Sequence, residues 1–473
     1  MTSFVGRKSE LGRLCALLDE VKQTGSARFL SVRGRRQVGK SRLMEEFIGR
    51  SGAKAVFYVA SQLDADAELE QFRQAVATSA TESAAIAAES SLGSWQAALT
   101  LLANEATKQE PIVIVLDEFP YLVGAYPPIE GVLQTIWDRT LEHKAPVMLI
   151  LVGSDITMME SLATHGRPLF NRPAELVVNP LSPSELASML SLDAVTALEA
   201  YLVIGGYPRL ATRWRAHDNI FKFIERELRD PESPLIVLGE RMLTAEFPAD
   251  LKAQSVLRAI GAGERTFKGI NQQANAGVSS TLAVALETMQ NVKRVVVKAR
   301  PYSAEPRPKL THYSIADPYL RFWLRFIEGQ QTTVQRGRGD VALARIKKDW
   351  LPYQGRAVEP IIRSAIERLL PDEKRFSDAL FVGGYWNRDS SIEVDLVGGQ
   401  APDKADPVSF VGSIKWLGNK PFDKWDLNAL LKHRTHTPGA DANTRLVGVS
   451  RTGFDVTGLD VHLTAEDILA AYR

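Results

Sequence analysis

The sequence contains little that would support a disulfide framework, a membrane span or a strongly charged surface. Only one of its 473 residues is a cysteine, Cys15, which excludes an internal disulfide and a cysteine-rich zinc site. Lys and Arg number 57 against 56 Asp and Glu, and the net charge of +1 gives no whole-molecule attraction to nucleic acid or membranes. The longest apolar runs, such as 112–116 and 147–152, are far shorter than the ~20 residues that cross a bilayer.

The composition is that of a folded chain, with 45% hydrophobic and 24% charged residues. Its length predicts two to four domains of about 100 to 200 residues each. The first residues, MTSFVGRKSELGRL, have neither the apolar segment nor the cleavage site of a signal peptide. We therefore expect a soluble, cytoplasmic protein with no membrane partner.

The first part of the chain alternates short β-branched runs with helical stretches, a pattern typical of a parallel sheet covered by helices on both faces. It predicts the fold class α/β, with residues 1–181 as the core domain. A helical insertion is expected over 62–106, which is rich in Ala, Glu and Gln. The predicted strands are 29–33, 55–59, 112–116, 148–152 and 175–178.

The rest of the chain predicts four further segments. A helical lid is expected over 182–250, starting at a capping box of Ser182 and Glu185. Three helical patterns and two strands, 292–298 and 310–315, predict a winged helix over 251–320, followed by a helical linker over 321–354. Residues 355–473 predict a second α/β unit with strands at 379–383, 392–397, 408–415 and 446–450.

A complete phosphate-loop motif follows the first predicted strand and runs into a helix. Backbone N–H groups and the helix N-terminus would cradle phosphates, while Lys40 reaches the β and γ groups and Ser41 ligates Mg²⁺. The alternative is a chance Gly-rich turn. The residues expected to contact ATP are Gly34, Arg35, Arg36, Gln37, Val38, Gly39, Lys40, Ser41 and, next in the helix, Arg42.

An acidic pair ends the buried segment PIVIVLDE at residues 111–118. Ligands of open α/β sheets bind at the carboxyl ends of strands, so we expect Asp117 to hold Mg²⁺ and Glu118 to polarise the attacking water. The alternative is that Asp117 caps a helix and Glu118 is merely solvated.

Two later residues have open roles. Ser154, at the end of the fourth predicted strand, would sense the γ-phosphate or instead cap the next helix. Arg172, before the fifth strand, would stabilise transition-state charge as an arginine finger or instead lie on the surface.

Together these segments resemble the archaeal-type P-loop ATPases of the AAA/STAND-related group. The resemblance rests on FVGR at 4–7, GRRQVGKS, VLDEFPYL, LVGSDI, IGGYPR at 204–209 and SIADPYLRFW at 314–323. It implies that Gly6 and Arg7 lie near the adenine and that Pro208 forms a lid turn over the nucleotide. Arg209 would contact the phosphates or form an ion pair within the lid. The resemblance also implies a C-terminal restriction-endonuclease-like domain.

The predicted winged helix is basic. Residues 251–310 contain ten Lys or Arg and three Glu, a local charge of +7. Lys293, Arg294, Arg307 and Lys309 would contact DNA phosphates. The candidate recognition helix, STLAVALETMQN, has no Lys or Arg, so little sequence preference is expected. The alternative is a protein-binding or interdomain module.

In the restriction-endonuclease-like fold, Glu359 at the start of a helix, Asp395 on a strand and Lys415 on the next strand match the site residue by residue. An acid is expected where Ser413 stands, and hydroxyl is a poor Mg²⁺ ligand compared with carboxylate. We therefore expect a degenerate site, unless Glu393 substitutes. A simple ion pair of Asp395 with Lys415 is the alternative.

These predictions combine into a Mg²⁺-dependent ATPase. ATP binding and hydrolysis would rearrange the winged-helix and nuclease-like module, acting on DNA in a defence or mobile-element setting. The alternative is a STAND-type signalling switch whose winged helix contacts protein. A homo-oligomer or a partner protein is compatible with both.

Overall fold

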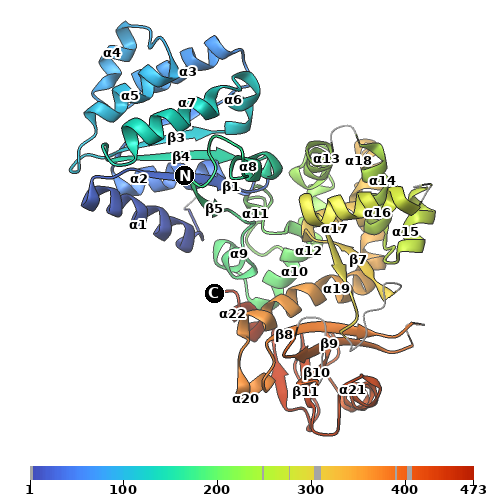
Figure 1. Ribbon diagram of the computed structural model, residues 1–473. Coiled ribbons are helices and arrows are strands. Elements are labelled where there is room, and N and C mark those ends of the chain that lie inside the picture. Colours follow the sequence, from blue (N-terminus) through green and yellow to red (C-terminus); the bar gives the residue numbers. More distant parts are fainter. Residues whose placement is uncertain are drawn as a thin grey trace. The chain divides into compact units, whose positions relative to one another are not determined.

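The computed structural model describes residues 4–247, 250–275, 277, 279–302, 310–388, 391–401 and 407–473. The chain divides into two compact units, Met1–Pro180 and Leu181–Arg473. The first unit is an α/β domain, and the second combines many helices with a second large sheet (Figure 1).

A fully parallel five-stranded sheet forms the first unit, which confirms the predicted fold class. The strand order is β2-β3-β4-β1-β5. Every residue of the central strands β3 and β4 is buried, as expected when helices cover both faces. The strands are β1 (Arg28–Arg33), β2 (Lys54–Val59), β3 (Ile112–Asp117), β4 (Val147–Gly153) and β5 (Ala174–Val177).

Helices α1 and α2 lie on one face of this sheet, and α5, α6 and α7 lie on the other (Figure 1). The segment expected to be helical contains α3, α4 and α5, and Phe72 and Trp95 pack there with their ring centroids 4.8 Å apart. The helices are α1 (Lys8–Thr24), α2 (Lys40–Ser51), α3 (Ala65–Ala77), α4 (Ser83–Glu89), α5 (Trp95–Glu105), α6 (Phe119–Ala125), α7 (Ile129–Ile136), the π-helix η1 (Trp137–Leu141) and α8 (Ile156–Leu162).

The second unit starts with five helices. The predicted capping box is present, with the Ser182 hydroxyl and the Glu185 carboxylate each accepting the other residue's backbone N–H. No single described helix is long and apolar enough to span a membrane; α9 and α10 pass that test only as a pair bent by 109°. The helices are α9 (Pro183–Leu190), α10 (Ala194–Ile204), α11 (Pro208–Ala211), α12 (Ile220–Glu227) and α13 (Pro234–Glu246).

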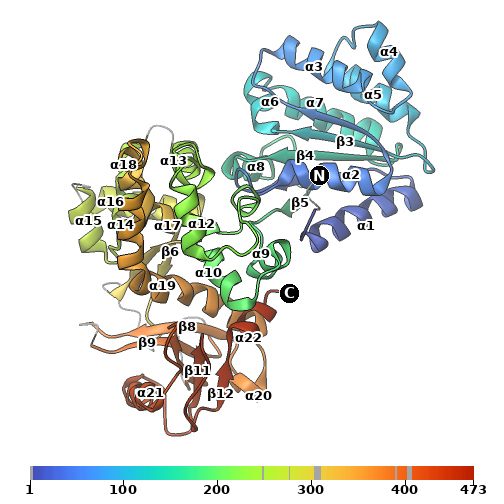
Figure 2. The same cartoon turned by 180° about the vertical axis from the view of Figure 1, so that it is seen from behind.

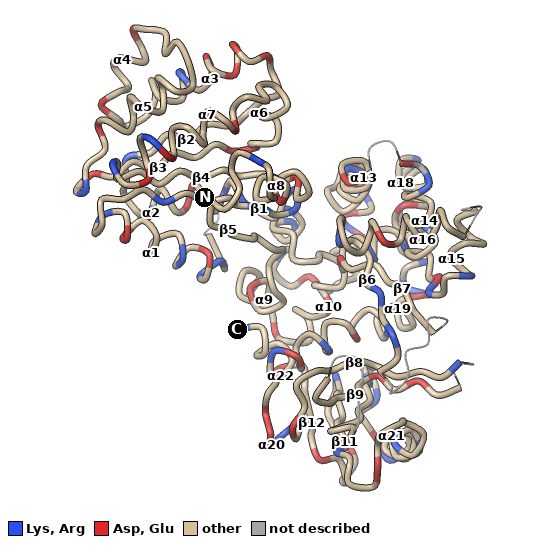
Figure 3. The backbone as a smooth tube through the Cα atoms, in the orientation of Figure 1, with Lys and Arg blue, Asp and Glu red and all other residues tan. Residues whose placement is uncertain are grey.

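Three helices and an antiparallel hairpin of β6 and β7 come next. Figure 3 shows Lys and Arg gathered along this hairpin. Two of the four predicted DNA-contacting residues, Arg307 and Lys309, lie outside the described residues. The elements are α14 (Leu251–Ala262), α15 (Phe267–Ala274), α16 (Ser279–Glu287), the π-helix η2 (Thr288–Val292), β6 (Val296–Ala299) and β7 (His312–Ile315).

A 31-residue helix, α19 (Gly339–Leu369), runs through residue 355, where the sequence predicted a domain boundary. The prediction that Glu359 begins a helix is wrong, because this residue lies well inside α19. A continuous apolar face, including Ile346, Val358 and Ile362, is buried along the helix and stabilises it despite Pro352 and Pro360. It follows α17 (Pro318–Phe322), the π-helix η4 (Trp323–Ile327), the 3₁₀-helix η5 (Glu328–Gln330) and α18 (Gln331–Gln335).

A second five-stranded sheet, in the order β12-β11-β10-β9-β8, completes the unit. β9 is antiparallel to β8 and β10, whereas β10, β11 and β12 are parallel. The sequence had indicated four strands and missed β12, which has three residues. The elements are α20 (Glu373–Phe376), β8 (Phe381–Trp386), β9 (Glu393–Gly399), β10 (Phe410–Lys415), α21 (Lys424–His436), β11 (Arg445–Ser450), β12 (Val461–Leu463) and α22 (Ala465–Ala470).

Helices α9 and α10 share one hydrophobic core with α19, α22 and this second sheet (Figure 2). Leu198 of α10, Ile362 of α19 and Phe410 of β10 are all fully buried in it. The segment predicted to be a lid therefore packs with the C-terminal sheet.

Candidate active site

The phosphate loop joins β1 to α2 in the first unit, and two of its glycines are required by its conformation. A Cβ on Gly34 would lie 2.2 Å from the Val178 carbonyl oxygen, too close for any other residue. Gly39 has φ 92°, in the left-handed region that glycine tolerates, and it caps α2. The loop therefore leads into a helix whose first N–H groups have no intrahelical acceptor, which is the arrangement that binds phosphate.

Lys40, the first residue of α2, is 5% exposed and lies against its own loop. Its ammonium donates hydrogen bonds to the carbonyl oxygens of Gly34 and Arg35, at 2.8 and 3.0 Å. Burial lowers the pKa of Lys40 to about 8, although the Glu118 and Asp117 carboxylates raise it. A phosphate bound here would act as the counter-ion of this desolvated ammonium.

The acidic pair lies at the carboxyl end of β3, as predicted. Asp117 is 2% exposed and accepts hydrogen bonds from the Ser41 hydroxyl and from the Glu118 N–H, the latter at 2.8 Å. Burial raises the pKa of Asp117, and these hydrogen bonds oppose that rise. The helix after β3 has no side-chain cap, so Asp117 does not act as the cap that the alternative interpretation required.

Glu118 is held in a left-handed conformation, with φ 50° and ψ 41°, which costs about 1 to 2 kcal/mol for a residue with a Cβ. The Ser154 hydroxyl donates a hydrogen bond to Glu118 Oε2 at 2.9 Å. The following helix, α8, is capped by Asp155, so Ser154 is not its cap. Ser154, directly after β4, thus holds the carboxylate of Glu118, directly after β3.

The residues present fit a Mg²⁺ ion that is shared with phosphates. Among the described residues, no group of three or more His, Cys, Asp or Glu could hold a metal by itself. Ser41 and Asp117 do place a hydroxyl and a carboxylate side by side. Mg²⁺ in nucleotide sites is commonly bound by one or two such oxygens together with substrate phosphates.

Arg7 links the N-terminal segment to the phosphate loop. It is 4% exposed, with a left-handed φ of 59°, and the preceding Gly6 has φ 79°. Its guanidinium donates to the Val38 carbonyl at 2.8 Å and pairs with Glu10 at 3.1 Å. The structure therefore places Arg7 against the loop, where it supports the loop's shape.

Two other arginines near the loop, Arg36 and Arg42, make contacts on the protein surface. Arg36 donates to the Tyr121 hydroxyl at 3.0 Å, and Tyr121, in the segment after Glu118, was not singled out from the sequence. Arg42 pairs with Glu45 at 3.1 Å. The exposed side chains of Arg36 and Arg42 therefore lie beside the phosphate loop.

Arg172 is held by its own unit. Its guanidinium makes two hydrogen bonds to the Asp138 carboxylate, at 2.8 and 2.7 Å, and donates to the Pro168 carbonyl at 2.9 Å. This bidentate ion pair is a structural contact. To act on a nucleotide, the side chain would first have to leave Asp138.

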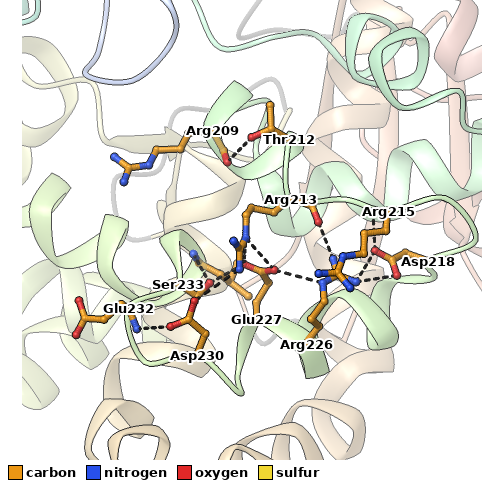
Figure 4. Close-up of polar contacts among 11 residues, drawn as sticks. Arg209, Thr212, Arg213, Arg215, Asp218, Arg226, Glu227, Asp230, Glu232 and Ser233 are labelled. Atoms are coloured by element: carbon orange, nitrogen blue, oxygen red, sulfur yellow. Dashed lines mark hydrogen bonds and ion pairs between the residues drawn. The ribbon is translucent and has the colours of Figure 1, made fainter. Parts of the chain in front are cut away.

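Arg209 lies in the second unit, at the start of α11. Figure 4 shows its guanidinium pointing away from the neighbouring ion pairs. Those pairs centre on fully buried Glu227, which accepts hydrogen bonds from Arg213 at 3.0 Å and from Ser233 at 2.6 Å. Of the residues described, no carboxylate lies within ion-pair distance of Arg209, so it does not form the lid ion pair that was the alternative.

The GGYP turn before Arg209 packs against the SIADPYLRFW segment. A Cβ on Gly206 would meet the Leu181 carbonyl oxygen at 2.1 Å. The Tyr207 hydroxyl donates to Asp317 Oδ2 at 2.7 Å in the protein interior, and Asp317 also caps α17 by accepting the Leu320 N–H. The two motifs thus form one buried contact, whereas the sequence indicated only a turn for the first.

The C-terminal sheet and α19 bring three of the four nuclease-like residues together. Asp395 on β9 accepts hydrogen bonds from the Ser413 hydroxyl at 3.1 Å and from the Ile414 N–H at 2.7 Å. Burial raises the pKa of Glu359 to about 7 and also raises that of Asp395; the Asp395 charge contributes to the shift at Glu359. Burial favours the neutral form of both carboxyl groups, and the Ser413 hydroxyl donates a hydrogen bond to Asp395. The two groups are therefore poor ligands for a hard cation.

Lys415, the fourth residue, pairs with Asp426 of α21 at 3.2 Å. The ion pair between Lys415 and Asp395, which was the alternative to a degenerate site, is not formed. Arg363 of α19 pairs with Glu359 at 3.1 Å and donates to the Asp395 carbonyl at 2.8 Å. Arg363 lies one helical turn after Glu359, a spacing that could have indicated it; nothing local to Lys415 indicates Asp426.

Residues 4–209 match a family described as an ATPase domain predominantly from Archaea, and residues 323–424 match archaeal and bacterial proteins of unknown function. An uncharacterized protein of Methanocaldococcus jannaschii, MJECL04, is 24% identical over 441 residues, which is 93% of each chain.

Among solved structures, the Walker-type ATPase PABY2304 of Pyrococcus abyssi aligns with a TM-score of 0.50 and 17% identity, covering 68% of this chain and 96% of that one. The Aeropyrum pernix ORC2 protein, in ADPNP and ADP complexes, aligns with a TM-score of 0.46 and 14% identity, covering 70% of this chain and 94% of that one. At 17% identity the first similarity concerns the fold alone.

Proposed function

From the premise that residues 4–209 are an archaeal-type P-loop ATPase domain, we propose that this chain binds ATP with Mg²⁺ and hydrolyses it at the phosphate loop. One observation carries the proposal: Lys40, Ser41, Asp117, Glu118 and Ser154 converge from the ends of two parallel strands, β3 and β4, and from the N-terminus of α2. This is the set of charges and hydroxyls that phosphoryl transfer to water requires.

Each residue has a task that follows from its contacts. Lys40 exchanges its two carbonyl acceptors for the β- and γ-phosphate oxygens, which neutralise its desolvated charge. Ser41 and Asp117 hold the cation, which when bound offsets the charge of the phosphates. Glu118 accepts a proton from the attacking water, and Ser154 keeps its carboxylate in place through the 2.9 Å hydrogen bond.

A further positive charge would speed the reaction by stabilising the transition state. Arg209 is better suited than Arg172, because Arg172 is neutralised by Asp138, whereas none of the described carboxylates pairs with Arg209.

The second unit would respond to the nucleotide by acting on DNA. Helices α14, α15 and α16 with the β6–β7 hairpin have the element order of a winged helix, and exposed Lys298 and Arg300 add charge to the hairpin. The degenerate acidic site suggests that the C-terminal sheet binds DNA or a partner without cutting it.

The second candidate function is a signalling switch that contacts protein. The observation in its favour is α16, which has no basic residue and exposes Val284 at 64%. An apolar side chain on this helix suits a protein interface better than a DNA groove.

The DNA-acting ATPase and the signalling switch are separated by steady-state ATP turnover. It is measured without DNA, with duplex DNA and with single-stranded DNA, and the mass of the protein in solution is measured in parallel. We expect turnover that stops when Mg²⁺ is chelated and rises with DNA. An ATP turnover rate that is unchanged by DNA but changes with self-association would favour the signalling switch. Absence of any ATP turnover would contradict the proposed function.

A further inference from the structure

A cavity of about 480 Å³ lies within the second unit. The end of α14, strand β7, the segment from α17 to η4, the middle of α19 and strands β8 and β9 all contribute to its walls. α19 runs between the β6–β7 hairpin and the second sheet in both views (Figures 1 and 2). This volume is typical of pockets that enclose a small molecule.

Arginine is the dominant charged residue of the walls. Five line the cavity, namely Arg265, Arg321, Arg325, Arg356 and Arg363. Three have carboxylate partners that also line it: Arg265 pairs with Glu393 at 3.3 Å, Arg325 with Asp349 at 3.7 Å and Arg363 with Glu359 at 3.1 Å. Glu264 is the remaining acidic lining residue, so the lining has one positive charge more than negative.

Arg321 comes from the SIADPYLRFW segment, to which the ATPase reaction gives no role. Its guanidinium donates to two backbone carbonyls, to Ile315 at 3.1 Å through Nε and to Ala357 at 3.3 Å through Nη1. No carboxylate of the described residues lies within 4.0 Å of it, and burial lowers its pKa. The carbonyls fix the side chain. The Asp317 and Glu359 charges favour the charged guanidinium without forming an ion pair with it, and burial outweighs them, so the cationic side chain lacks a direct anionic partner, which is costly away from water.

Arg356 is a second arginine of the lining without an ion-pair partner among the described residues. It lies on the face of α19 that also presents Asp349, Tyr353 and Arg363 to the cavity, at helical spacings of three, four and seven residues. It is exposed and makes no hydrogen bond or ion pair with any part of the chain that the structure describes. Two arginines without counter-ions therefore line one concave site, on neighbouring helices.

We propose that this cavity binds a small phosphorylated molecule of about mononucleotide size, whose phosphate is held by Arg321 and Arg356. Guanidinium groups match the oxygens of a phosphate in charge and in planar, bidentate geometry. Tyr313, Tyr353 and Trp386 give the remaining walls an aromatic character that suits a ring-bearing ligand. Such a ligand would bridge α17, α19 and the β7 strand, and so stabilise the second unit in one arrangement.

The test uses the full chain carrying Lys40→Ala, so that the phosphate loop contributes little. Adenosine 5′-monophosphate, inorganic phosphate and adenosine are titrated by calorimetry into this parent. Arg356→Ala and Arg321→Met are then added separately, and Arg336→Ala serves as the matched control, since Arg336 is exposed but does not line the cavity. Thermal unfolding reports whether each variant is folded.

We expect the monophosphate to bind more tightly than adenosine. Arg356→Ala should weaken its binding about tenfold or more, as for loss of one charge-assisted hydrogen bond, and Arg336→Ala should leave it unchanged. Arg321→Met should abolish binding; if that variant fails to fold, Arg356→Ala still decides. No saturable binding of the monophosphate or of phosphate up to about 10 mM would overturn the proposal.

Binding that is equal in Arg356→Ala and its parent would overturn it as well. A 5′-phosphorylated single-stranded oligonucleotide is titrated in parallel. If only the oligonucleotide binds in an Arg356-dependent way, the cavity receives nucleic acid and the small-molecule assignment is wrong. Because the parent already lacks Lys40, these outcomes do not depend on ATP hydrolysis.

Discussion

Glu118→Gln should separate ATP binding from ATP hydrolysis. Glutamine has nearly the same shape as glutamate, and its side-chain carbonyl can still accept the 2.9 Å hydrogen bond from Ser154. What is lost is the carboxylate that accepts a proton from water. General-base catalysis contributes about 10² to 10⁴ in rate, so turnover should fall at least about 10²-fold while the ATP dissociation constant stays nearly the same.

The assay is single-turnover hydrolysis with enzyme in excess, which excludes product release from the measured rate. Glu45→Gln is the matched control, because Glu45 is an exposed carboxylate on α2 whose partner is Arg42. Ser154→Ala should slow the reaction by about tenfold, since it frees the Glu118 side chain without removing it. Equal rates for Glu118→Gln and the unsubstituted chain would refute the role of Glu118, as would loss of ATP binding in Glu118→Gln.

Three further predictions concern the second unit. Tyr207→Phe removes the buried hydrogen bond to Asp317 and should destabilise this unit by about 1 to 3 kcal/mol, seen as a lower thermal transition; an unchanged transition would contradict that contact's importance. The unsubstituted chain should not cleave plasmid DNA with Mg²⁺ or Mn²⁺, whereas Ser413→Glu should raise metal affinity; robust cleavage without substitution would show that the site is intact. The double substitution Lys298→Ala with Arg300→Ala should weaken DNA binding at low salt and reduce the magnitude of the slope of log affinity against log salt by about 2. An unchanged slope would show that the hairpin does not contact the DNA phosphates.

The nucleotide site was predictable from the sequence because its determinants are local. Gly34, Gly39 and Lys40 form a loop whose shape depends on adjacent residues, and Asp117 is the last residue of a strand so apolar that its burial was evident. The parallel order of the strands then brings these segments to one edge of the sheet. Ser154 joins them for the same reason, at the end of β4.

The second unit was less predictable because its contacts join distant segments. Nothing near Lys415 shows that Asp426 competes for its charge, and nothing near Tyr207 shows that its partner is Asp317. Glu359 was expected at the start of a helix, yet α19 begins at Gly339, because its buried apolar face keeps the helix continuous through Pro352 and Pro360.

Equilibrium binding of ATP to the unsubstituted chain, Lys40→Ala and the exposed-lysine control Lys22→Ala tests the central claim most directly. Lys40 is buried against the loop and its ammonium is the charge that the phosphates would meet. Loss of its charge-assisted hydrogen bonds should weaken ATP binding at least about 10²-fold, whereas Lys22→Ala should leave it unchanged. Equal ATP affinity in all three chains would contradict the assignment of the phosphate loop as the nucleotide site.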